Sequence, residues 1–265
     1  MSASDDIRIG MIGLDTSHAP GFTRLLNDPS HDHHVPGGRV VAGWPGGSPD
    51  FPASIDRVEG FTAQLRDELG VEMLDSPEAV AEAVDLLPVT AVDGRVHREL
   101  VDRVLPAGKP TFVDKPFATR SADAQAMVDA ARAAGVPLMS SSTLRYTDSL
   151  VAAIESLGGP TGVTGIDVFG VLSFQEALPG LFWYGCHAVE VVVAALGPDC
   201  SRVFCQVGEG AEVYVWEFTD GRLATYRGNT VGKWGFGGVV HGEQGNPTFS
   251  TAAPGRPFDA IMLEA

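Results

Sequence analysis

The chain has 265 residues, 44% of them hydrophobic, which is enough to bury the core of one large domain or of two modest ones. Its 34 acidic and 18 basic residues give a formal net charge of -16 at pH 7, which opposes binding to nucleic-acid phosphates and to anionic membrane surfaces. The 3 cysteines are too few and too irregularly spaced for a disulfide framework or a zinc knuckle, which is typical of a reducing compartment.

The amino terminus, residues 1–6, is polar and acidic, so no secretory signal is expected there. No unbroken apolar stretch reaches the length that a membrane span requires. We therefore predict a cytoplasmic protein whose partners include neither nucleic acid nor a membrane.

The first half of the chain alternates short β-type runs with amphipathic stretches, a pattern typical of a parallel sheet covered by helices on both faces. Ser76-Pro77 is a helix start, with a serine cap and a proline at the first helical position. We predict a Rossmann-like, doubly wound domain over residues 1–142. Its expected strands are 7–12, 39–43, 84–89, 110–113 and 136–140, and its other expected helices are 20–26, 57–69, 96–105 and 121–134.

The second half changes to long β-rich runs after a helix that we expect to start at Leu144. Asp220-Gly221 is a tight hairpin signal between two of these runs. We predict a smaller α+β domain with a mostly antiparallel sheet over residues 143–265, shortened so that a last strand or helix is missing. Its expected strands are 163–172, 201–207, 211–219 and 222–227, with one helix at 185–196.

The loop after the first strand reads G-M-I-G-L-D-T-S-H over residues 10–18, where a dinucleotide-binding domain carries its G-x-G-x-x-G turn. Gly13 fits the first glycine, but Asp15 and His18 occupy the second and third positions. A carboxylate at the second position repels a pyrophosphate, and a side chain at the third separates helix from strand. We favour a capping role for one of the side chains before the helix, with or without a ligand: Asp15, Thr16 or Ser17.

The second strand runs into Trp44 and a glycine-rich loop instead of ending in the acidic residue that normally receives ribose hydroxyls. The sequence therefore predicts NAD or NADP as cofactor, without a preference between them.

Lys115 follows the short apolar run that ends at Val113, so it is expected at the carboxyl end of a strand. In an open α/β sheet that end faces the ligand crevice, where a lysine can donate a proton or clamp a substrate. A solvated turn before Pro116 is the alternative, and the residues alone leave both interpretations open.

Three motifs of the sequence resemble motifs of the Gfo/Idh/MocA family, the glucose-fructose oxidoreductase and inositol dehydrogenase group. The resemblance extends over nearly the whole chain. Residues 108–116 are similar to the family's G-K-x-V-x-x-E-K-P signature, with Asp114 in place of glutamate. Residues 185–190 are similar to its G-x-H-x-x-D motif, and residues 144–146 resemble its arginine–aromatic pair. His97 matches the histidine that follows the family's T-P-N segment.

The resemblance implies an NAD(P)-dependent oxidoreductase acting on a sugar, a polyol or a related hydroxylated small molecule. It makes Lys115 the general acid or base and substrate clamp, and His187 the second proton carrier. Trp183 stands where the family has an aspartate, which leaves His187 without its expected charge partner. The implied substrate-binding residues are Arg145, Tyr146, Trp183 and Glu190. The implied cofactor-binding residues are Gly13, Asp15, Thr16, Ser17, His18, His97 and Asp114.

The resemblance also implies self-association through the sheet of the second domain, so a homo-oligomer is expected. Two other functions stay open: a cofactor-independent lyase, isomerase or hydrolase that uses Lys115 and crevice histidines, and a non-catalytic small-molecule-binding subunit. In the first of these, His18, His97 and His187 converge on the crevice. The cluster at residues 31–34 is interpreted as a solvated or crevice-lining loop, and no metal site is predicted.

Overall fold

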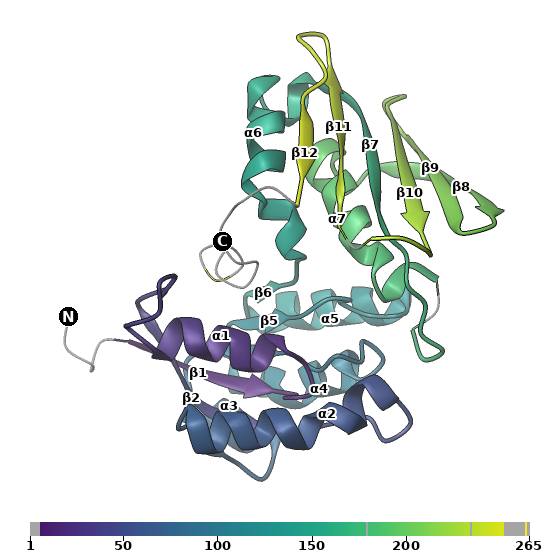
Figure 1. The fold of residues 1–265 in the computed structure, drawn as a ribbon. Helices are drawn as coiled ribbons and strands as arrows, with labels where there is room; N and C mark the ends of the chain where they lie inside the picture. The colour runs from purple at the N-terminus through teal and green to yellow at the C-terminus, as the bar shows by residue number, and fades with distance from the viewer. Residues whose placement is uncertain (1–5, 179, 234, 252–262, 264–265) are drawn as a thin grey trace. The chain divides into compact units, whose positions relative to one another are not determined.

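The computed structural model describes residues 6–178, 180–233, 235–251 and 263, so most of the polar amino terminus lies outside the described residues. The chain divides into two units between Ser141 and Ser142, and each unit is built on its own sheet (Figure 1). Within the described part, no helix combines the length and apolar character needed to cross a bilayer.

The first unit contains a six-stranded sheet in the order β3-β2-β1-β4-β5-β6, and each neighbouring pair is parallel. The chain moves outward from β1 in one direction and then, at β4, in the other. That reversal makes a topological switch point, where the carboxyl ends of β1 and β4 diverge to leave room for a ligand. The strands are β1 (Ile7–Ile12), β2 (Gly38–Trp44), β3 (Glu72–Met73), β4 (Leu87–Val89), β5 (Thr111–Val113) and β6 (Leu138–Met139).

The helices of the first unit follow the expected alternation and confirm the Rossmann-like class (Figure 1). Ser76 caps α3 by accepting a hydrogen bond from the Ala79 N–H at 3.1 Å, as predicted. Gly135 ends α5 in the left-handed conformation, with φ 66°. The helices are α1 (His18–Asn27), α2 (Pro52–Ala63), α3 (Pro77–Ala83), α4 (His97–Val104) and α5 (Ser121–Ala134), with η1 (Gln64–Glu68) and η2 (Leu105–Ala107) as short extensions.

The core of this unit consists largely of apolar side chains from the central strands. These strands are apolar along their length because helices cover both faces of a parallel sheet. Ile12, Val89 and Val113 come from β1, β4 and β5, and all are fully buried. Met127 of α5 is also fully buried in the same cluster. The buried core fixes the strand ends, and the strand ends position the loops of the candidate site.

The second unit contains a six-stranded mixed sheet in the order β12-β11-β7-β10-β9-β8. Among the described strands of this second sheet, only β7 and β10 pair in parallel, so the predicted α+β domain with a mostly antiparallel sheet is confirmed. Its elements are η3 (Thr143–Tyr146), α6 (Asp148–Ser156), η4 (Pro160–Gly162), β7 (Val163–Val171), η5 (Gly180–Phe182), α7 (Gly185–Leu196), β8 (Cys200–Gly208), β9 (Ala211–Phe218), β10 (Leu223–Asn229), β11 (Gly237–Gly242) and β12 (Thr248–Ser250).

One face of this second sheet is buried and the other is open. On β7, Ile166 and Val168 point inward, while Asp167 and Phe169 between and beyond them are exposed. α7 and α6 pack on the buried side, against β7 and β12. Tyr226 is fully buried there and donates its hydroxyl to the Val171 carbonyl at 2.6 Å.

Three expectations about the elements are wrong. α2 begins at Pro52, not at Arg57, because a proline fits the first helical position. Residues 143–146 form a 3-10 turn, and the helix starts only at Asp148. The second unit includes β11 and β12, which the sequence analysis did not predict, because β11 begins with two glycines and has little β-propensity.

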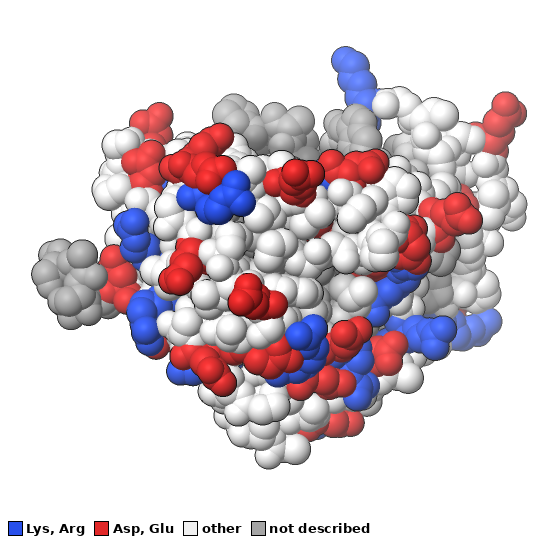
Figure 2. Space-filling view, turned by 90° about the horizontal axis from the view of Figure 1, so that it is seen from below, with Lys and Arg blue, Asp and Glu red and all other residues white. Residues whose placement is uncertain are grey.

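Charged residues of both signs are interspersed over the face of the molecule shown in Figure 2. Several form ion pairs at the surface of the first unit, such as Arg103 with Glu78 at 2.7 Å and Arg98 with Asp102 at 2.6 Å. Some of the acidic side chains are therefore paired locally with arginines.

Candidate active site

The glycine turn after β1 lies at the switch point of the parallel sheet. Gly13 has φ 85°, and a Cβ built on it would lie 2.6 Å from the backbone of Ala91, so only glycine fits. Its N–H donates to the Trp44 carbonyl at 3.0 Å, and its own carbonyl accepts from Thr90 Oγ1 at 2.6 Å. The turn is thus held from β2 on one side and from β4 on the other.

Asp15 is fully buried in the first unit. Its carboxylate accepts hydrogen bonds from Ser54 Oγ and from the Val92 N–H at 2.9 Å. Ser54 in turn accepts from the Ser48 N–H at 2.7 Å. Burial raises the pKa of Asp15, although these hydrogen bonds and the charge of Arg57 oppose the shift. The side chain therefore links the loops that follow β1, β2 and β4.

The prediction that Asp15 caps α1 is wrong, because its carboxylate contacts Ser54 and Val92 instead. Ser17 occupies the N-cap position of α1, but its side chain makes no capping hydrogen bond. Thr16 Oγ1 accepts from the His18 N–H at 3.4 Å, a long contact at the start of the helix. Pro20, the third residue of α1, has no N–H to offer.

His18 and Asp114 form a close pair at the carboxyl edge of the sheet. Nδ1 of His18 lies 2.6 Å from Oδ2 of Asp114, and the other carboxylate oxygen accepts from the Lys115 N–H at 2.8 Å. Asp114 is buried, whereas the His18 side chain is 26% exposed. Burial would raise the pKa of Asp114, but the charge and hydrogen bond of His18 outweigh burial and lower that pKa to about 2. The carboxylate is therefore ionised at neutral pH.

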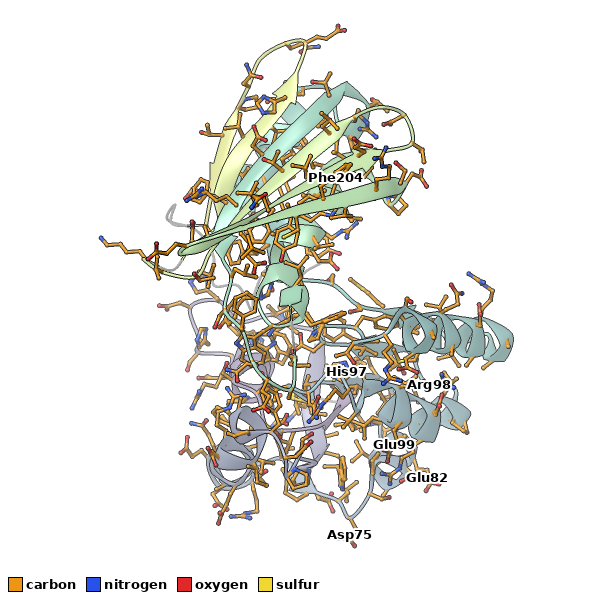
Figure 3. The ribbon with its side chains drawn as sticks, turned by 90° about the vertical axis from the view of Figure 1, so that its right-hand side faces the viewer. Asp75, Glu82, His97, Arg98, Glu99 and Phe204 are labelled. Atoms are coloured by element: carbon orange, nitrogen blue, oxygen red, sulfur yellow. The ribbon has the colours of Figure 1, made fainter. Side chains whose placement is uncertain are left out.

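His97 is fully buried, and its ring bridges two loops of the first unit. Nε2 lies 2.7 Å from the Ala91 carbonyl oxygen and Nδ1 lies 3.0 Å from that of Pro116. Figure 3 shows His97 inside the unit, with Arg98 and Glu99 further along the same helix. The histidine therefore holds the loop after β4 to the segment that carries Lys115.

A charge network next to this site was not predicted from the sequence. Arg95 contacts the fully buried Asp93 at 2.7 Å and the exposed Asp50 at 2.8 Å. Burial opposes ionisation of Asp93, but hydrogen bonds from Arg95 and Ser48 lower its pKa below the ordinary value. The network joins the loop after β4 to the loop before α2, which are far apart in sequence.

In the second unit, His187 has a hydroxyl partner where the sequence analysis noted only a missing aspartate. Ser142 Oγ lies 2.6 Å from Nδ1 of His187, and Ser142 is buried. The rings of Tyr184 and Phe236 lie 5.8 and 5.7 Å from the imidazole. These contacts fix the orientation of the ring at the start of α7.

The predicted substrate-binding residues lie near the same helix. Arg145 and Glu190 form an ion pair at 2.7 Å, with each side chain about one-third exposed or less. The Trp183 ring makes an edge contact with Tyr184 at 5.7 Å. Tyr146 is half-buried in the turn that follows Ser142. The structure thus pairs two of these four residues directly with each other.

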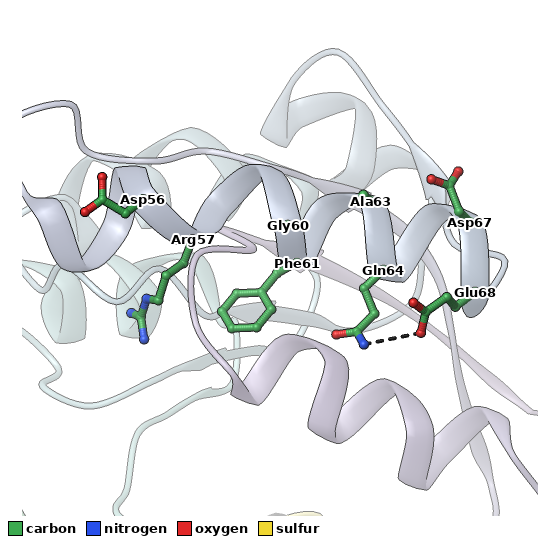
Figure 4. Close-up of a pocket in the computed structure, with 8 residues that line it drawn as sticks. All are labelled: Asp56, Arg57, Gly60, Phe61, Ala63, Gln64, Asp67 and Glu68. Atoms are coloured by element: carbon green, nitrogen blue, oxygen red, sulfur yellow. Dashed lines mark hydrogen bonds between the residues drawn. The ribbon is translucent and has the colours of Figure 1, made fainter.

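A separate pocket of about 440 Å³ runs along α2 and contains none of the predicted site residues (Figure 4). Arg57 and Phe61 lie on it together, with the guanidinium 5.9 Å from the ring centroid. Nη2 of Arg57 is buried with no hydrogen-bond partner among the described residues. Gln64 donates to Glu68 at 3.3 Å at the other end of the pocket.

Nothing in the described ranges brings three His, Cys, Asp or Glu side chains together as a metal site. Within the histidine-rich loop, His34 Nδ1 lies 2.9 Å from the Leu25 carbonyl, and His31 Nδ1 accepts from the His33 N–H at 3.1 Å. Local backbone contacts thus account for these side chains.

The residues of the first unit fit a dinucleotide. Gly13 makes the tight turn at the switch point, and the first turn of α1 has no acidic residue. Both carboxylate oxygens of the fully buried Asp15 accept hydrogen bonds, one from Ser54 Oγ and the other from the Val92 N–H. β2 ends at Trp44 and not at an acidic residue, and the Trp44 ring lies 5.6 Å from the Arg103 guanidinium.

Two curated relatives match parts of the chain. The D-apiose dehydrogenase of Paraburkholderia graminis is 36% identical over 111 residues, which cover 41% of this chain and 29% of that protein. The inositol 2-dehydrogenase of Paracoccus denitrificans is 32% identical over 158 residues, which cover 59% of this chain and 43% of that protein. The matched segments therefore span less than half of the length of either relative.

A solved structure of myo-inositol dehydrogenase from Lactobacillus casei, in complex with NAD(H) and myo-inositol, has the same fold. Its TM-score is 0.72, and the match covers 95% of this chain and 75% of that chain at 15% identity. A family model described as an oxidoreductase family with an NAD-binding Rossmann fold matches residues 7–142. Since this match spans just over half of the residues, the chain belongs to the Gfo/Idh/MocA oxidoreductase family.

Proposed function

We propose that the chain binds NAD or NADP in its first unit and transfers hydride between that cofactor and a hydroxylated small molecule, a sugar or a polyol. The observation that carries the proposal is the Gly13 turn at the switch point of a parallel sheet, in a unit matched by the family. The substrate class is supported by the names of the relatives, which are dehydrogenases of D-apiose and of inositol.

The cofactor-binding residues divide into two groups in this proposal. Gly13, Thr16, Ser17 and His18 form the turn and the start of α1, which would receive the phosphates. The second group would hold the loops of this surface in place, because its members are buried and hydrogen-bonded within the unit. It consists of Asp15, His97 and Asp114. When bound, the nicotinamide ring supplies the hydride acceptor or donor.

Oxidation of an alcohol needs a group that accepts the hydroxyl proton while the C–H bond breaks and the carbonyl forms. We assign Lys115 as acid or base and substrate clamp, since it follows β5 at the carboxyl edge of the sheet. We assign His187 as the second proton carrier, because Ser142 and two aromatic rings hold its imidazole in one orientation.

The second unit supplies the substrate-binding residues in this proposal. The ion pair of Arg145 with Glu190 presents donors and acceptors suited to hydroxyl groups, and Tyr146 and Trp183 add aromatic surface. We assign residues 1–142 as the dinucleotide-binding domain and residues 143–265 as the substrate and oligomerisation domain of a cytoplasmic homo-oligomer.

The test is a fluorescence titration of the purified protein with NADH and NADPH separately, followed by turnover assays with myo-inositol and D-apiose. Saturable binding of either nucleotide with oxidation of a polyol or sugar is the expected result. A folded sample that binds neither nucleotide would remove the proposal.

A second candidate keeps the fold without hydride transfer, as a lyase, isomerase or hydrolase. The occupation of the third glycine position by His18, paired with Asp114, favours it because a histidine–carboxylate pair can move protons without a cofactor. Turnover without added nucleotide separates this candidate from the first. A third candidate, a non-catalytic binding subunit, predicts ligand binding without turnover.

A further inference from the structure

Two departures from the expected motifs contact each other in the first unit. His18 stands where the glycine pattern has its third glycine, and Asp114 stands where the lysine motif has glutamate. The structure joins them at 2.6 Å, although 96 positions separate them in sequence. An aspartate is one methylene shorter than a glutamate, which leaves room for an imidazole at this contact.

We propose that His18, oriented by Asp114, is an acid–base residue of the first unit that exchanges the proton of the substrate hydroxyl beside Lys115. The inference rests on the proposed oxidoreductase function and deepens it. In oxidation, the O–H bond breaks and its proton passes to Nε2 of His18. A bound nicotinamide cofactor would accept the hydride from the C–H bond as the carbonyl forms.

The tautomer of His18 follows from its partner. An ionised carboxylate only accepts hydrogen bonds, so Nδ1 of His18 carries the hydrogen in the contact with Asp114. In the neutral ring Nε2 then carries the lone pair, which is the form that accepts a proton. Asp114 is a positioning residue here, because it selects the tautomer and stabilises the imidazolium that forms.

The surroundings suit a proton carrier. The His18 side chain is partly exposed, so its proton can exchange with solvent, while its carboxylate partner is 4% exposed. Lys115, at the end of β5, is a charged neighbour of the pair, and its charge lowers the pKa of Asp114. From α1, Phe22 contributes an uncharged ring 5.4 Å from the imidazole. Asp15, in the preceding loop, is bonded to Ser54 and Val92 instead.

Lys115 lies next to this pair in the chain. The same carboxylate that contacts His18 accepts the Lys115 backbone N–H at 2.8 Å, so one group holds both segments. A substrate hydroxyl clamped by Lys115 therefore lies at the same edge of the sheet as His18.

The test compares the wild-type protein with His18→Gln and Asp114→Asn, and uses His33→Gln in the exposed histidine-rich loop as the matched control. For each protein, NADH binding is measured by fluorescence, and NAD-dependent oxidation of myo-inositol and D-apiose is followed against pH. We expect His18→Gln to lower kcat by about 10²–10⁴-fold when kcat is measured at saturating NAD, whatever its effect on cofactor affinity, since His18 also lies at the cofactor turn. We expect Asp114→Asn to lower kcat at least about tenfold and to move the acidic limb of the pH profile to lower pH.

A kcat for His18→Gln within about threefold of wild type, with an unchanged pH profile, would overturn the proposal, since general acid–base catalysis is worth far more. Weaker NADH binding in His18→Gln with kcat unchanged at saturating cofactor would also overturn it, by assigning His18 to the cofactor site alone.

Nitrogen-detected NMR of the His18 ring tests the pair without any substrate. The expected result is the Nδ1–H tautomer in the wild type, with a titration that moves to lower pH in Asp114→Asn. The Nε2–H tautomer would overturn the proposal. Failure of the wild type to bind NADH and NADPH would instead count against the oxidoreductase function, so the two failures are distinguishable.

Discussion

Asp114 joins the start of α1 to the segment that carries Lys115. It is buried at the end of β5, where its two oxygens contact His18 and the Lys115 backbone. A buried carboxylate is stable only when it is paired and hydrogen-bonded, and both conditions are met here. The charge of Asp114 should therefore contribute to folding as well as to chemistry.

Replacement of Asp114 by asparagine should make the free energy of unfolding less dependent on pH in the acidic range. The folded-state pKa of Asp114 is about 2, below the ordinary value of 3.8, so its contribution is present above about pH 4 and is lost as pH falls through about 2. The size of that contribution is about 2 kcal/mol. Asp114→Asn is expected to lower the free energy of unfolding by about that amount at neutral pH and by less in acid.

Urea unfolding at a series of pH values measures this difference. The exposed residue Asp75, labelled in Figure 3, provides the control variant Asp75→Asn, for which no comparable loss is expected. Equal losses for Asp114→Asn at neutral and acidic pH would contradict the ionic origin of the effect.

The sequence predicts most of the candidate residues but not the partners that they contact. It identified His18, Asp114 and Lys115 separately, because each departs from or matches a short motif. It could not pair His18 with Asp114, since a contact between residues far apart in sequence leaves no local pattern. Ser142 was missed as the partner of His187 for the same reason, with 45 positions between them.

The glycine turn is the element that most constrains this site. Its position between β1 and α1 is fixed by hydrogen bonds to Trp44, at the end of β2, and to Thr90, directly after β4. The space beside Gly13 is filled by the backbone of Ala91, which cannot move without disturbing the loop after β4.

Replacement of Gly13 by alanine should destabilise the first unit by about 2–5 kcal/mol, from the combined cost of a left-handed backbone and of overpacking. The matched control is Gly70→Ala, because Gly70 has a similar φ of 69° but nothing lies within 4 Å of the point where its Cβ would be. The control should cost only about 1–2 kcal/mol, from the backbone alone.

Chemical denaturation of both variants separates the steric contribution from the backbone contribution. Equal losses for the two alanine variants would mean that the loop after β4 yields to the new methyl group, and that Ala91 does not hold the turn rigidly.

At the level of elements, the periodicity of apolar residues predicts the long elements reliably. α5 and α7 have the predicted bounds, because serine, glycine and apolar spacing mark both ends. β3 and β12 are only two and three residues long, and neither provides enough positions for a period to appear. These short segments form strands because they pair with longer neighbouring strands, β3 with β2 and β12 with β11.

The open face of the second sheet carries exposed apolar side chains, which matter for the self-association of the molecule. Phe169 and Leu223 lie on neighbouring strands of this face and are 50% and 52% exposed. A cavity of about 460 Å³ over the same face is lined by Phe169, Thr225 and Val239, among others. Exposed apolar surface on a sheet is a feature of interaction sites, which agrees with the proposed homo-oligomer.

Replacement of Phe169 by aspartate should therefore weaken self-association. Wild-type protein is expected to form dimers or tetramers, and Phe169→Asp should raise the dissociation constant at least about tenfold, since burying an unpaired charge at an interface costs more than about 1.4 kcal/mol. Val231→Asp is the control, because Val231 is 71% exposed outside the sheet strands.

Size-exclusion chromatography with light scattering over a range of protein concentrations measures the mass directly. A monomeric wild-type protein would contradict the proposed oligomer, and an unchanged mass for Phe169→Asp would move the interface away from this face.

At the scale of the whole chain, the change from alternating helices and strands to long β-rich runs predicted two sheets of different kinds, and the structure has both. The strand order of each sheet was beyond the sequence, since pairing such as β7 with β10 depends on packing around α7. The fold class is therefore encoded in local periodicity, whereas the order of strands is encoded in contacts between distant residues.

The buried Asp15 has a consequence for ligand affinity. Its hydrogen bonds to Ser54 and Val92 hold together three loops that meet at the switch point. Loops that are already ordered lose little conformational entropy when a ligand arrives, so more of each contact appears as affinity. A motif that gives up the second glycine can in this way retain a binding surface, with rigidity supplied by a side chain in place of close backbone approach.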